Sequence, residues 1–143
     1  MARDADEIAR ASAASMWADD TASQSLGMEI ESVAAGRARL AMVVRDTMAN
    51  GLGMCHGGFI FTLADSACAF ASNSYNQRAL LQSGQITLFA SAKVGMRLVA
   101  EASERQRVER SAIYDVTVRT ADGQVIAEFR GFTRNVPGQL VPD

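Results

Sequence analysis

Residues 50–71 read NGLGMCHGGFIFTLADSACAFA, and this stretch decides the fold. After the paired glycines, Gly57 and Gly58, apolar residues occupy every side of a helical projection instead of alternating as they do in a strand. A helix that is apolar on all sides is a buried helix. We therefore predict a helix from Gly57 or Gly58 to about Asn73 at the core of the domain, with a single charge, Asp65, within it.

The segments outside this helix alternate apolar and polar residues with the period of two that is typical of half-buried strands. Before the helix, residues 26–31 and 38–44 predict a hairpin. After it, the pattern predicts four strands: Ile86–Ala92, Leu98–Val108, Ala112–Arg119 and a last strand from Val125 through Phe129. Short turns make consecutive strands antiparallel. Together with a short helix over residues 4–17, these elements predict an α+β fold in which one buried helix crosses an antiparallel sheet.

Length and composition restrict the class of protein. A chain of 143 residues without repeats or linkers fits one domain, residues 1–143. Its apolar stretches are too short to span a membrane, and a net charge of −2 without a dense basic block argues against a nucleic-acid partner. The acidic N-terminal residues do not form a secretory signal, so we expect a cytoplasmic protein.

The two cysteines and the one histidine do not predict a metal site. Cys55 and Cys68 are thirteen positions apart, without a Cys-x-x-Cys motif, and His56 is the only histidine. Free, buried thiols are the ordinary interpretation of such cysteines. We expect no metal and no cofactor.

Asp65 has two interpretations. An ionised carboxylate in a buried helix is costly unless it is paired or hydrogen-bonded, and otherwise its pKa rises. In the structural interpretation, Asp65 accepts hydrogen bonds from a neighbouring backbone group or hydroxyl, or it lies on a hydrated face. In the functional interpretation, it is a general base or a nucleophile at a cleft. Asp65 alone does not distinguish them.

The start of the predicted helix favours the functional interpretation. His56, Gly57 and Gly58 leave backbone N–H groups uncovered at the positive end of the helix dipole, where a carbonyl oxygen can be held as negative charge builds on it. Paired glycines also occur in ordinary turns. A lone histidine beside a turn more often makes structural hydrogen bonds than it catalyses, and Asn50 before Gly51 is typical of a residue that shapes a loop.

Helix geometry then predicts a homodimer. Gly57 and Asp65 are eight residues apart, which is about 12 Å along a helix axis. The carbon and oxygen of one carbonyl are only about 1.2 Å apart, and each catalytic group must lie within about 3.5 Å of its target. Two copies of the helix, antiparallel across a two-fold axis, can bring Gly57 of one subunit beside Asp65 of the other.

The pattern Asn50-x5-His56-Gly57-Gly58-x4-Leu63-Ala64-Asp65 closely resembles the acyl-CoA thioesterases of the hotdog fold, in the phenylacetate-degradation branch. The resemblance implies an antiparallel sheet wrapped around a long central helix. It implies that Asp65 activates water or attacks the thioester carbonyl, that the Gly57 N–H of the partner subunit polarises this carbonyl, and that Asn50, also from the other subunit, orients the nucleophile. It also assigns a further set of residues to the substrate side of the site: His56, Gly58, Ser66 and Ser83.

The resemblance further implies an acyl-CoA substrate, no cofactor, and a homodimer that associates into a homotetramer, a dimer of dimers. An apolar acyl pocket near Phe59 and Leu63 suits an aryl or medium-chain acyl group. The phosphates of coenzyme A need cations, and three residues can supply them: Lys93, Arg97 or Arg134. A non-catalytic acyl-CoA-binding module and a hotdog hydratase or dehydratase are the alternatives.

Overall fold

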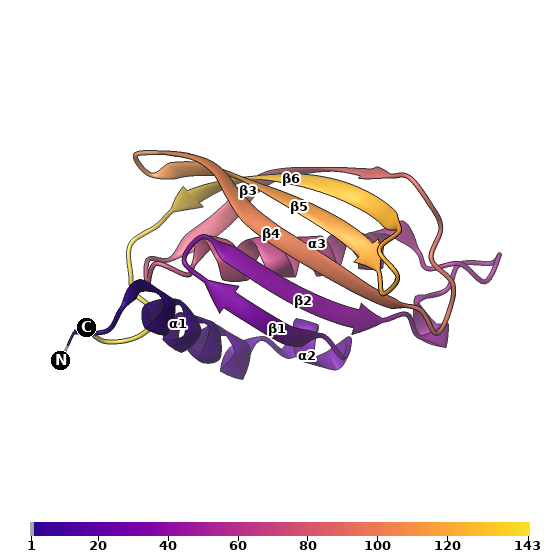
Figure 1. Cartoon of the computed structure of the whole chain (residues 1–143), viewed down its shortest axis with the longest axis horizontal. Helices are drawn as coiled ribbons and strands as arrows, with labels where there is room; N and C mark the ends of the chain where they lie inside the picture. Colours follow the sequence, from indigo (N-terminus) through magenta and orange to yellow (C-terminus); the bar gives the residue numbers. More distant parts are fainter. Residues whose placement is uncertain (1) are drawn as a thin grey trace.

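The structure is a computed structural model that describes residues 2–143, so Met1 of the expected domain lies outside the described residues. Its elements follow the order α1 (Ala5–Asp19), α2 (Thr21–Ser25), β1 (Glu29–Ala34), β2 (Arg37–Val43), η1 (Asp46–Met48), α3 (Gly57–Ser72), β3 (Ala79–Leu88), β4 (Arg97–Val108), β5 (Ser111–Thr120) and β6 (Val125–Asn135). The strands form one antiparallel sheet in the order β1-β2-β4-β5-β6-β3 (Figure 1).

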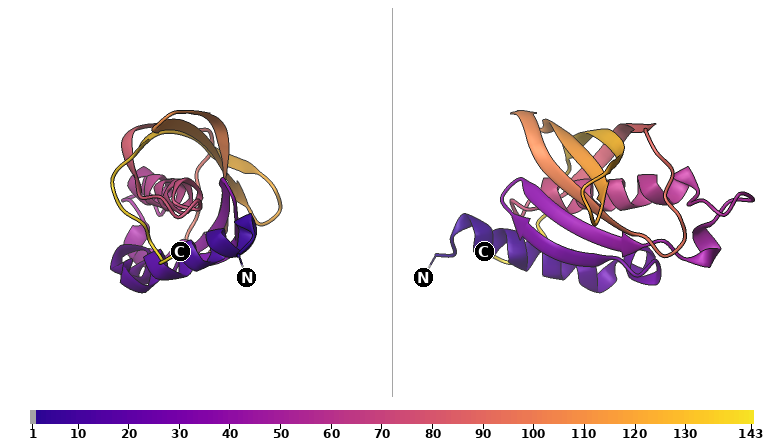
Figure 2. Two further views of the ribbon diagram at one scale, coloured as in Figure 1. Left: turned by 90° about the vertical axis from the view of Figure 1, so that its left-hand side faces the viewer. Right: turned by 45° about the vertical axis from the view of Figure 1, so that its right-hand side comes forward.

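The sheet curls around α3, which is the central helix that the sequence predicts (Figure 2). Buried side chains lie along most of α3: Ile60, Leu63, Ala64, Ala67, Cys68, Phe70 and Ala71. The strands bury every second residue against them, as in Leu98, Ala100 and Ala102 of β4 and Tyr114, Val116 and Val118 of β5. The expected hotdog architecture, a sheet wrapped around one long helix, is confirmed.

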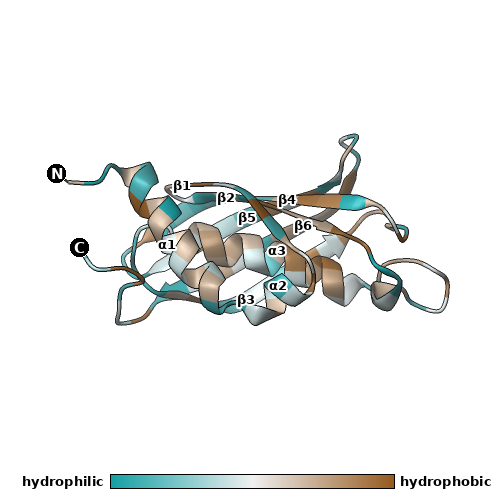
Figure 3. Ribbon diagram, turned by 90° about the horizontal axis from the view of Figure 1, so that it is seen from below, coloured by the Kyte–Doolittle hydropathy of each residue, from teal (hydrophilic) through white to brown (hydrophobic). Residues whose placement is uncertain are grey.

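The two N-terminal helices cover the side of α3 that the sheet leaves open (Figure 3). The Trp17 ring of α1 packs against Phe70 of α3 with a centroid distance of 6.3 Å. Ser23 of α2 lies within hydrogen-bonding distance of Ser66 of α3. The sequence predicts α1 but not α2, because α2 is only five residues long.

Three strands differ in their boundaries from the sequence prediction. β1 begins and ends three residues later than expected, and β6 continues past Phe129 to Asn135. The prediction for the third strand, residues 86–92, is wrong for most of its length, since β3 spans Ala79–Leu88. Ser83 therefore lies within β3, next to a bulge, and not before the strand. β3 is an edge strand with most side chains exposed, so it lacks the alternation that identifies a half-buried strand.

Within residues 2–143, no helix combines the length and the apolar composition needed to cross a membrane. Cys55 and Cys68 are both free and buried, as expected.

Candidate active site

The N-terminus of α3 presents an unpaired backbone N–H. His56 is the N-cap residue, with extended backbone angles of φ −61° and ψ 133°, and its Nδ1 accepts a hydrogen bond of 3.3 Å from the Gly58 N–H. Gly57 is the first helical residue, a position for which the helix itself offers no acceptor. No residue between 2 and 143 accepts its N–H either. The positive end of the helix dipole thus carries one open donor, at Gly57.

Gly57 also lies against the end of β3. A Cβ atom at this position would be 2.8 Å from Cδ1 of Leu88, closer than real Cβ contacts allow. Leu88 is the last residue of β3, and 47% of its surface is exposed. The absence of a side chain at Gly57 therefore lets Leu88 pack against the start of α3, beside the exposed edge of the sheet.

Asp65 is a half-buried carboxylate on α3. Its oxygens make no hydrogen bond or ion pair with any residue of the described chain, so the hydrogen-bonded form of the structural interpretation is not found. Burial raises the pKa of the Asp65 carboxyl, and the negative charge of Asp20 raises it further. A carboxyl with a raised pKa and no internal partner is available to take a proton or to attack a substrate.

Cys68, one turn after Asp65, does not compete as a nucleophile. Burial, together with the Asp65 charge, raises the pKa of the Cys68 thiol to about 12. A thiol must ionise to react as a nucleophile, so Cys68 remains an inert thiol near neutral pH. Burial raises the pKa of Cys55 as well.

Asn50 shapes its loop and still has a free donor. Its Oδ1 accepts hydrogen bonds from the backbone N–H of Leu52 (2.9 Å) and Met54 (3.1 Å). The Asn50 side chain is exposed, and its amide nitrogen donates to no residue in the described part of the chain. A 2.7 Å bond from the His56 N–H to the Met48 carbonyl ties this loop to the start of α3. Asn50 therefore offers an N–H donor at the same end of the helix as Gly57.

The predicted site residues form two groups within one chain. Asn50, His56, Gly57 and Gly58 lie together at the start of α3, while Asp65 and Ser66 lie two turns further along it. Because α3 is one continuous helix, the separation of about 12 Å between Gly57 and Asp65 holds in the structure. Ser83 is exposed on β3 and joins neither group through a hydrogen bond among the described residues.

The structure adds two residues that the sequence analysis missed. Asp20 and Ser23 lie beside the Asp65 end of α3, where Ser23 Oγ is 2.9 Å from Ser66 Oγ and Asp20 acts on Asp65 through its charge. The spacing Asp20-x-x-Ser23 is typical of a helix cap, and Asp20 does cap α2. That local signal carries no information about which helix the cap packs against.

The proposed phosphate-binding cations are not equivalent. Arg97 is engaged in ion pairs with Glu31 at 3.0 Å and Glu29 at 3.5 Å. Lys93 and Arg134 make no ion pair with the residues that the structure describes. Among residues 2–143, no group of three or more His, Cys, Asp or Glu side chains is arranged to hold a metal ion.

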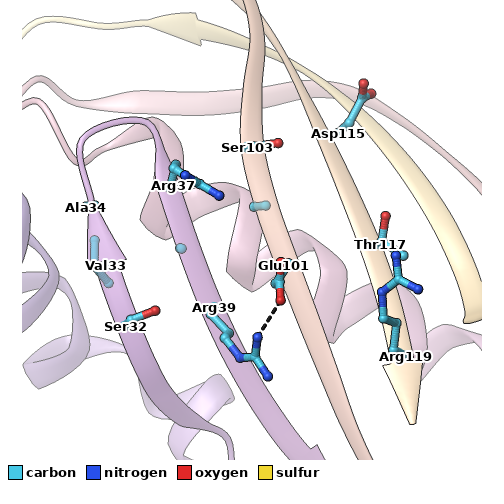
Figure 4. Close-up of a pocket in the computed structure, with 12 residues that line it drawn as sticks. Ser32, Val33, Ala34, Arg37, Arg39, Glu101, Ser103, Asp115, Thr117 and Arg119 are labelled. Atoms are coloured by element: carbon cyan, nitrogen blue, oxygen red, sulfur yellow. Dashed lines mark hydrogen bonds and ion pairs between the residues drawn. The ribbon is translucent and has the colours of Figure 1, made fainter. Parts of the chain in front are cut away.

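A groove of about 450 Å³ lies on the outer face of the sheet and not at α3 (Figure 4). Its lining is largely polar, and Arg39 points toward Glu101, with which it forms an ion pair of 2.5 Å. The groove contains none of the predicted site residues. We therefore place the candidate active site at α3, where the open donor and the unpaired carboxylate lie.

Comparison with known proteins identifies the family. The family described as the thioesterase superfamily matches residues 52–127. The acyl-coenzyme A thioesterase PaaI of Escherichia coli K12 is 32% identical over 125 residues, which cover 87% of this chain and 89% of the relative. A putative esterase of Archaeoglobus fulgidus is 35% identical over 127 residues, or 89% of this chain and 82% of the relative.

Two solved structures extend this result. The E. coli PaaI protein from the phenylacetic acid degradation operon matches with a TM-score of 0.93 at 31% identity, covering 95% of this chain and 99% of that one. The smu.793 protein of Streptococcus mutans UA159, bound to acetyl CoA, matches with a TM-score of 0.75 at 25% identity, covering 78% and 90%. The chain therefore belongs to the thioesterase superfamily, with the hotdog fold, and is a thioester hydrolase.

Proposed function

We propose that the protein hydrolyses the thioester of an aryl- or medium-chain acyl-CoA to a free acid and coenzyme A. The observation that carries this proposal is the pair of unpaired groups on α3, the Asp65 carboxylate and the Gly57 N–H, about 12 Å apart. One supplies a base or nucleophile and the other an oxyanion donor, which are the two requirements of acyl transfer. Similarity to the PaaI acyl-coenzyme A thioesterase supports the choice of substrate class.

The site is shared between two subunits of a homodimer. The exposed edge of β3 supports this arrangement, because the other sheet edge, β1, packs against α1. The end of β3 carries exposed apolar side chains, with Leu88 47% and Phe89 63% exposed. An unpaired strand edge readily pairs with a copy of itself, and a two-fold axis there would run the two α3 helices antiparallel. Gly57 lies against Leu88, so this edge is next to the oxyanion donor.

In the proposed reaction, the Gly57 N–H of the partner subunit donates to the thioester carbonyl oxygen, and the Asn50 amide of that same subunit orients the nucleophile. Asp65 takes one proton from a water molecule while the water oxygen bonds to the carbonyl carbon. The tetrahedral intermediate collapses, the carbon–sulfur bond breaks, and the coenzyme A thiolate takes up the proton. If Asp65 attacks directly, a mixed anhydride forms and water then cleaves it.

The two routes differ in where heavy oxygen from water ends up during a single turnover. Water activated by Asp65 places the label only in the acid product. Direct attack followed by hydrolysis of the anhydride at the Asp65 carbonyl places label in Asp65 itself, which mass spectrometry of the recovered protein detects.

Substrate binding follows from the remaining predicted residues. Leu63 is fully buried in the core and Phe59 is only partly buried beside it, so Phe59 is the side chain that we assign to the acyl group. Lys93 and Arg134 are available for the phosphates of coenzyme A. His56 supports the oxyanion loop by accepting from the Gly58 N–H. In this proposal Ser83, which is exposed on β3, helps to position water.

The test is release of free thiol from a panel of acyl-CoAs that includes phenylacetyl-CoA and aliphatic chains of several lengths. We expect turnover by the natural chain and a loss of at least about 10²-fold in kcat for Asp65→Asn and Asp65→Ala. Equal release by all three proteins would overturn the assignment of Asp65. Binding of acyl-CoA without release would favour the non-catalytic module, and hydration of an enoyl-CoA would favour the hydratase.

Light scattering of the same preparation tests the assembly. A homotetramer, a dimer of dimers, has four times the chain mass of 15.3 kDa. A monomeric species with full activity would contradict a shared site.

A further inference from the structure

A short chain of hydrogen bonds leads from the N-terminal segment to the residue next to Asp65. The Ser23 N–H donates to Oδ1 of Asp20 at 3.0 Å, and the Ser23 hydroxyl donates to Oδ2 at 2.7 Å. The same hydroxyl oxygen lies 2.9 Å from the Ser66 hydroxyl oxygen. Ser23 is only 2% exposed, so bulk water does not compete for these bonds.

The chain has a fixed direction. An ionised carboxylate only accepts hydrogen bonds, and a serine hydroxyl has one proton. The proton of Ser23 is used on Asp20, so in the contact between the two serines Ser66 must be the donor. With its own proton used on Ser23, the Ser66 hydroxyl can offer only lone pairs to any further group.

Asp20 is also the charged group that acts on Asp65. Burial raises the pKa of Asp65 first, and the Asp20 charge adds to this effect. The strands packed against α3 contribute apolar side chains to the core around this helix, such as Leu40, Leu98 and Val116. On α3 itself, Cys68 remains a neutral thiol because its pKa is about 12. The N-terminal segment thus acts on Asp65 by charge and on Ser66 by hydrogen bonding.

We propose that Asp20 and Ser23 are positioning residues that hold the Ser66 hydroxyl as a hydrogen-bond acceptor beside Asp65. The inference rests on the proposed function. Attacking water has two protons: Asp65 takes one, and Ser66 accepts a hydrogen bond from the other. A water molecule held by both acceptors directs a lone pair away from them, toward the carbonyl carbon. A Ser66 hydroxyl free to rotate would instead donate to Asp65 or to the water and weaken the base.

The first experiment compares Ser23→Ala, Ser66→Ala and the double variant. Because Ser23 acts only through Ser66, we expect each single change to lower kcat about three- to tenfold, the worth of one hydrogen bond, with little change in KM. The double variant should lose no more than Ser66→Ala alone. Ser25→Ala is the matched control, since Ser25 lies on the exposed side of α2 and its hydroxyl bonds only to the Ala22 carbonyl among the described residues. Multiplied losses in the double variant, or no loss in Ser23→Ala, would overturn the proposal.

The second experiment uses Asp20→Asn, which removes the charge but retains an oxygen for Ser23 and an equally good helix cap. We expect the pKa of the Asp65 carboxyl to fall in a carbon-detected NMR titration, and the acid limb of kcat/KM to move to lower pH. Glu7→Gln, an exposed change of the same charge, should leave both unchanged. An unchanged pKa of Asp65 in Asp20→Asn would contradict the coupling even in an active enzyme.

The NMR titration needs no turnover, so the two hypotheses can fail separately. A protein in which Asp20→Asn lowers the pKa of Asp65, but which hydrolyses no acyl-CoA, would refute the proposed function. The same result would still support the electrostatic coupling between Asp20 and Asp65.

Discussion

Asp65 combines a cost in stability with the catalytic role that we propose for it. The carboxylate is half-buried, has no hydrogen-bonding partner among residues 2–143, and lies near a second negative charge. A folded chain tolerates such a group when function requires it, because desolvation makes the carboxylate a stronger base. The same desolvation disfavours the ionised form of Asp65. Because the carboxyl is desolvated only in the folded state, this lowers the stability of the folded state at neutral pH.

Asp65→Asn should therefore increase the free energy of unfolding at neutral pH. The pKa of Asp65 is raised in the folded state, so the folded state binds the proton more tightly than the unfolded state does. Stability is then highest below the ordinary pKa of about 3.9 and falls as the pH rises to the raised value. The gain from Asp65→Asn should be present at pH 7 and absent near pH 3.

Urea unfolding at both pH values measures this gain. Glu7→Gln is the control, because its exposed carboxyl should produce no comparable difference. If Asp65→Asn were equally stabilising at pH 3 and pH 7, the carboxylate would not be the source of the effect.

Gly57→Pro tests the backbone donor directly. Proline lacks the N–H, is favoured at the first helical position, and accepts the extended angles of the preceding His56. We expect kcat to fall about 10²- to 10³-fold, the effect of losing one oxyanion donor. Gly57→Ala keeps the N–H and meets only the flexible end of Leu88, so it should lose far less. If the two variants lost kcat equally in thiol-release assays, the loss would come from the added side-chain atoms near Leu88 and not from the missing N–H.

At the residue scale, the sequence alone identifies candidate site residues that can be recognised from their neighbours in the chain. Asp65 is recognised as an acid within an apolar helix, and Gly57 as a glycine at the start of that helix. Asp20 and Ser23 could not be, since their effect depends on α2 packing against α3. The residues next to Asp20 and Ser23 in the sequence do not indicate that α2 packs against α3.

At the scale of the elements, α3 was predictable and β3 was not. The predicted helix, from Gly57 or Gly58 to about Asn73, matches α3, which ends at Ser72, because its apolar surface extends all round. β3 contains the polar run Gln82 to Gln85, exposed at the sheet edge, and a bulge between Leu81 and Ser83 interrupts its register. Edge strands, which are largely exposed, show a weaker alternation of apolar and polar residues than strands inside a core.

Close packing between α3 and the β3–β6 pair explains why a second position, residue 131, is a glycine. A Cβ on Gly131 would lie 2.9 Å from Sγ of Cys68 and 3.0 Å from both Leu81 Cδ1 and Phe129 Cε1. Gly131→Ala should therefore cost about 1 to 3 kcal/mol by overpacking. Gly51→Ala is the matched control, because a Cβ there meets no atom within 4 Å. Equal free energies of unfolding for the two variants in urea would contradict this account of the packing.

At the scale of the whole molecule, the sequence predicts a shared site although it does not describe the interface. The rise of a helix and the size of a carbonyl group are enough to keep Gly57 and Asp65 of one chain from serving the same carbonyl. The structure adds a surface on which such pairing is feasible, the edge of β3 with its exposed Leu80, Leu88 and Phe89. A single sequence does not specify how the side chains at that edge would pack against a second copy of the chain.

Complementation between two inactive variants tests the shared site most directly. Gly57→Pro lacks the donor and Asp65→Asn lacks the carboxylate, so neither forms an active homodimer. In a mixed dimer, one site combines both defects, and the other combines an intact Gly57 with an intact Asp65. Random reassembly of equal amounts makes half of the dimers mixed, each with one working site of two. The account predicts recovery of about a quarter of the natural thioesterase activity. Activity that stays at the level of the separate variants, in a preparation shown by mass spectrometry to contain mixed dimers, would contradict it.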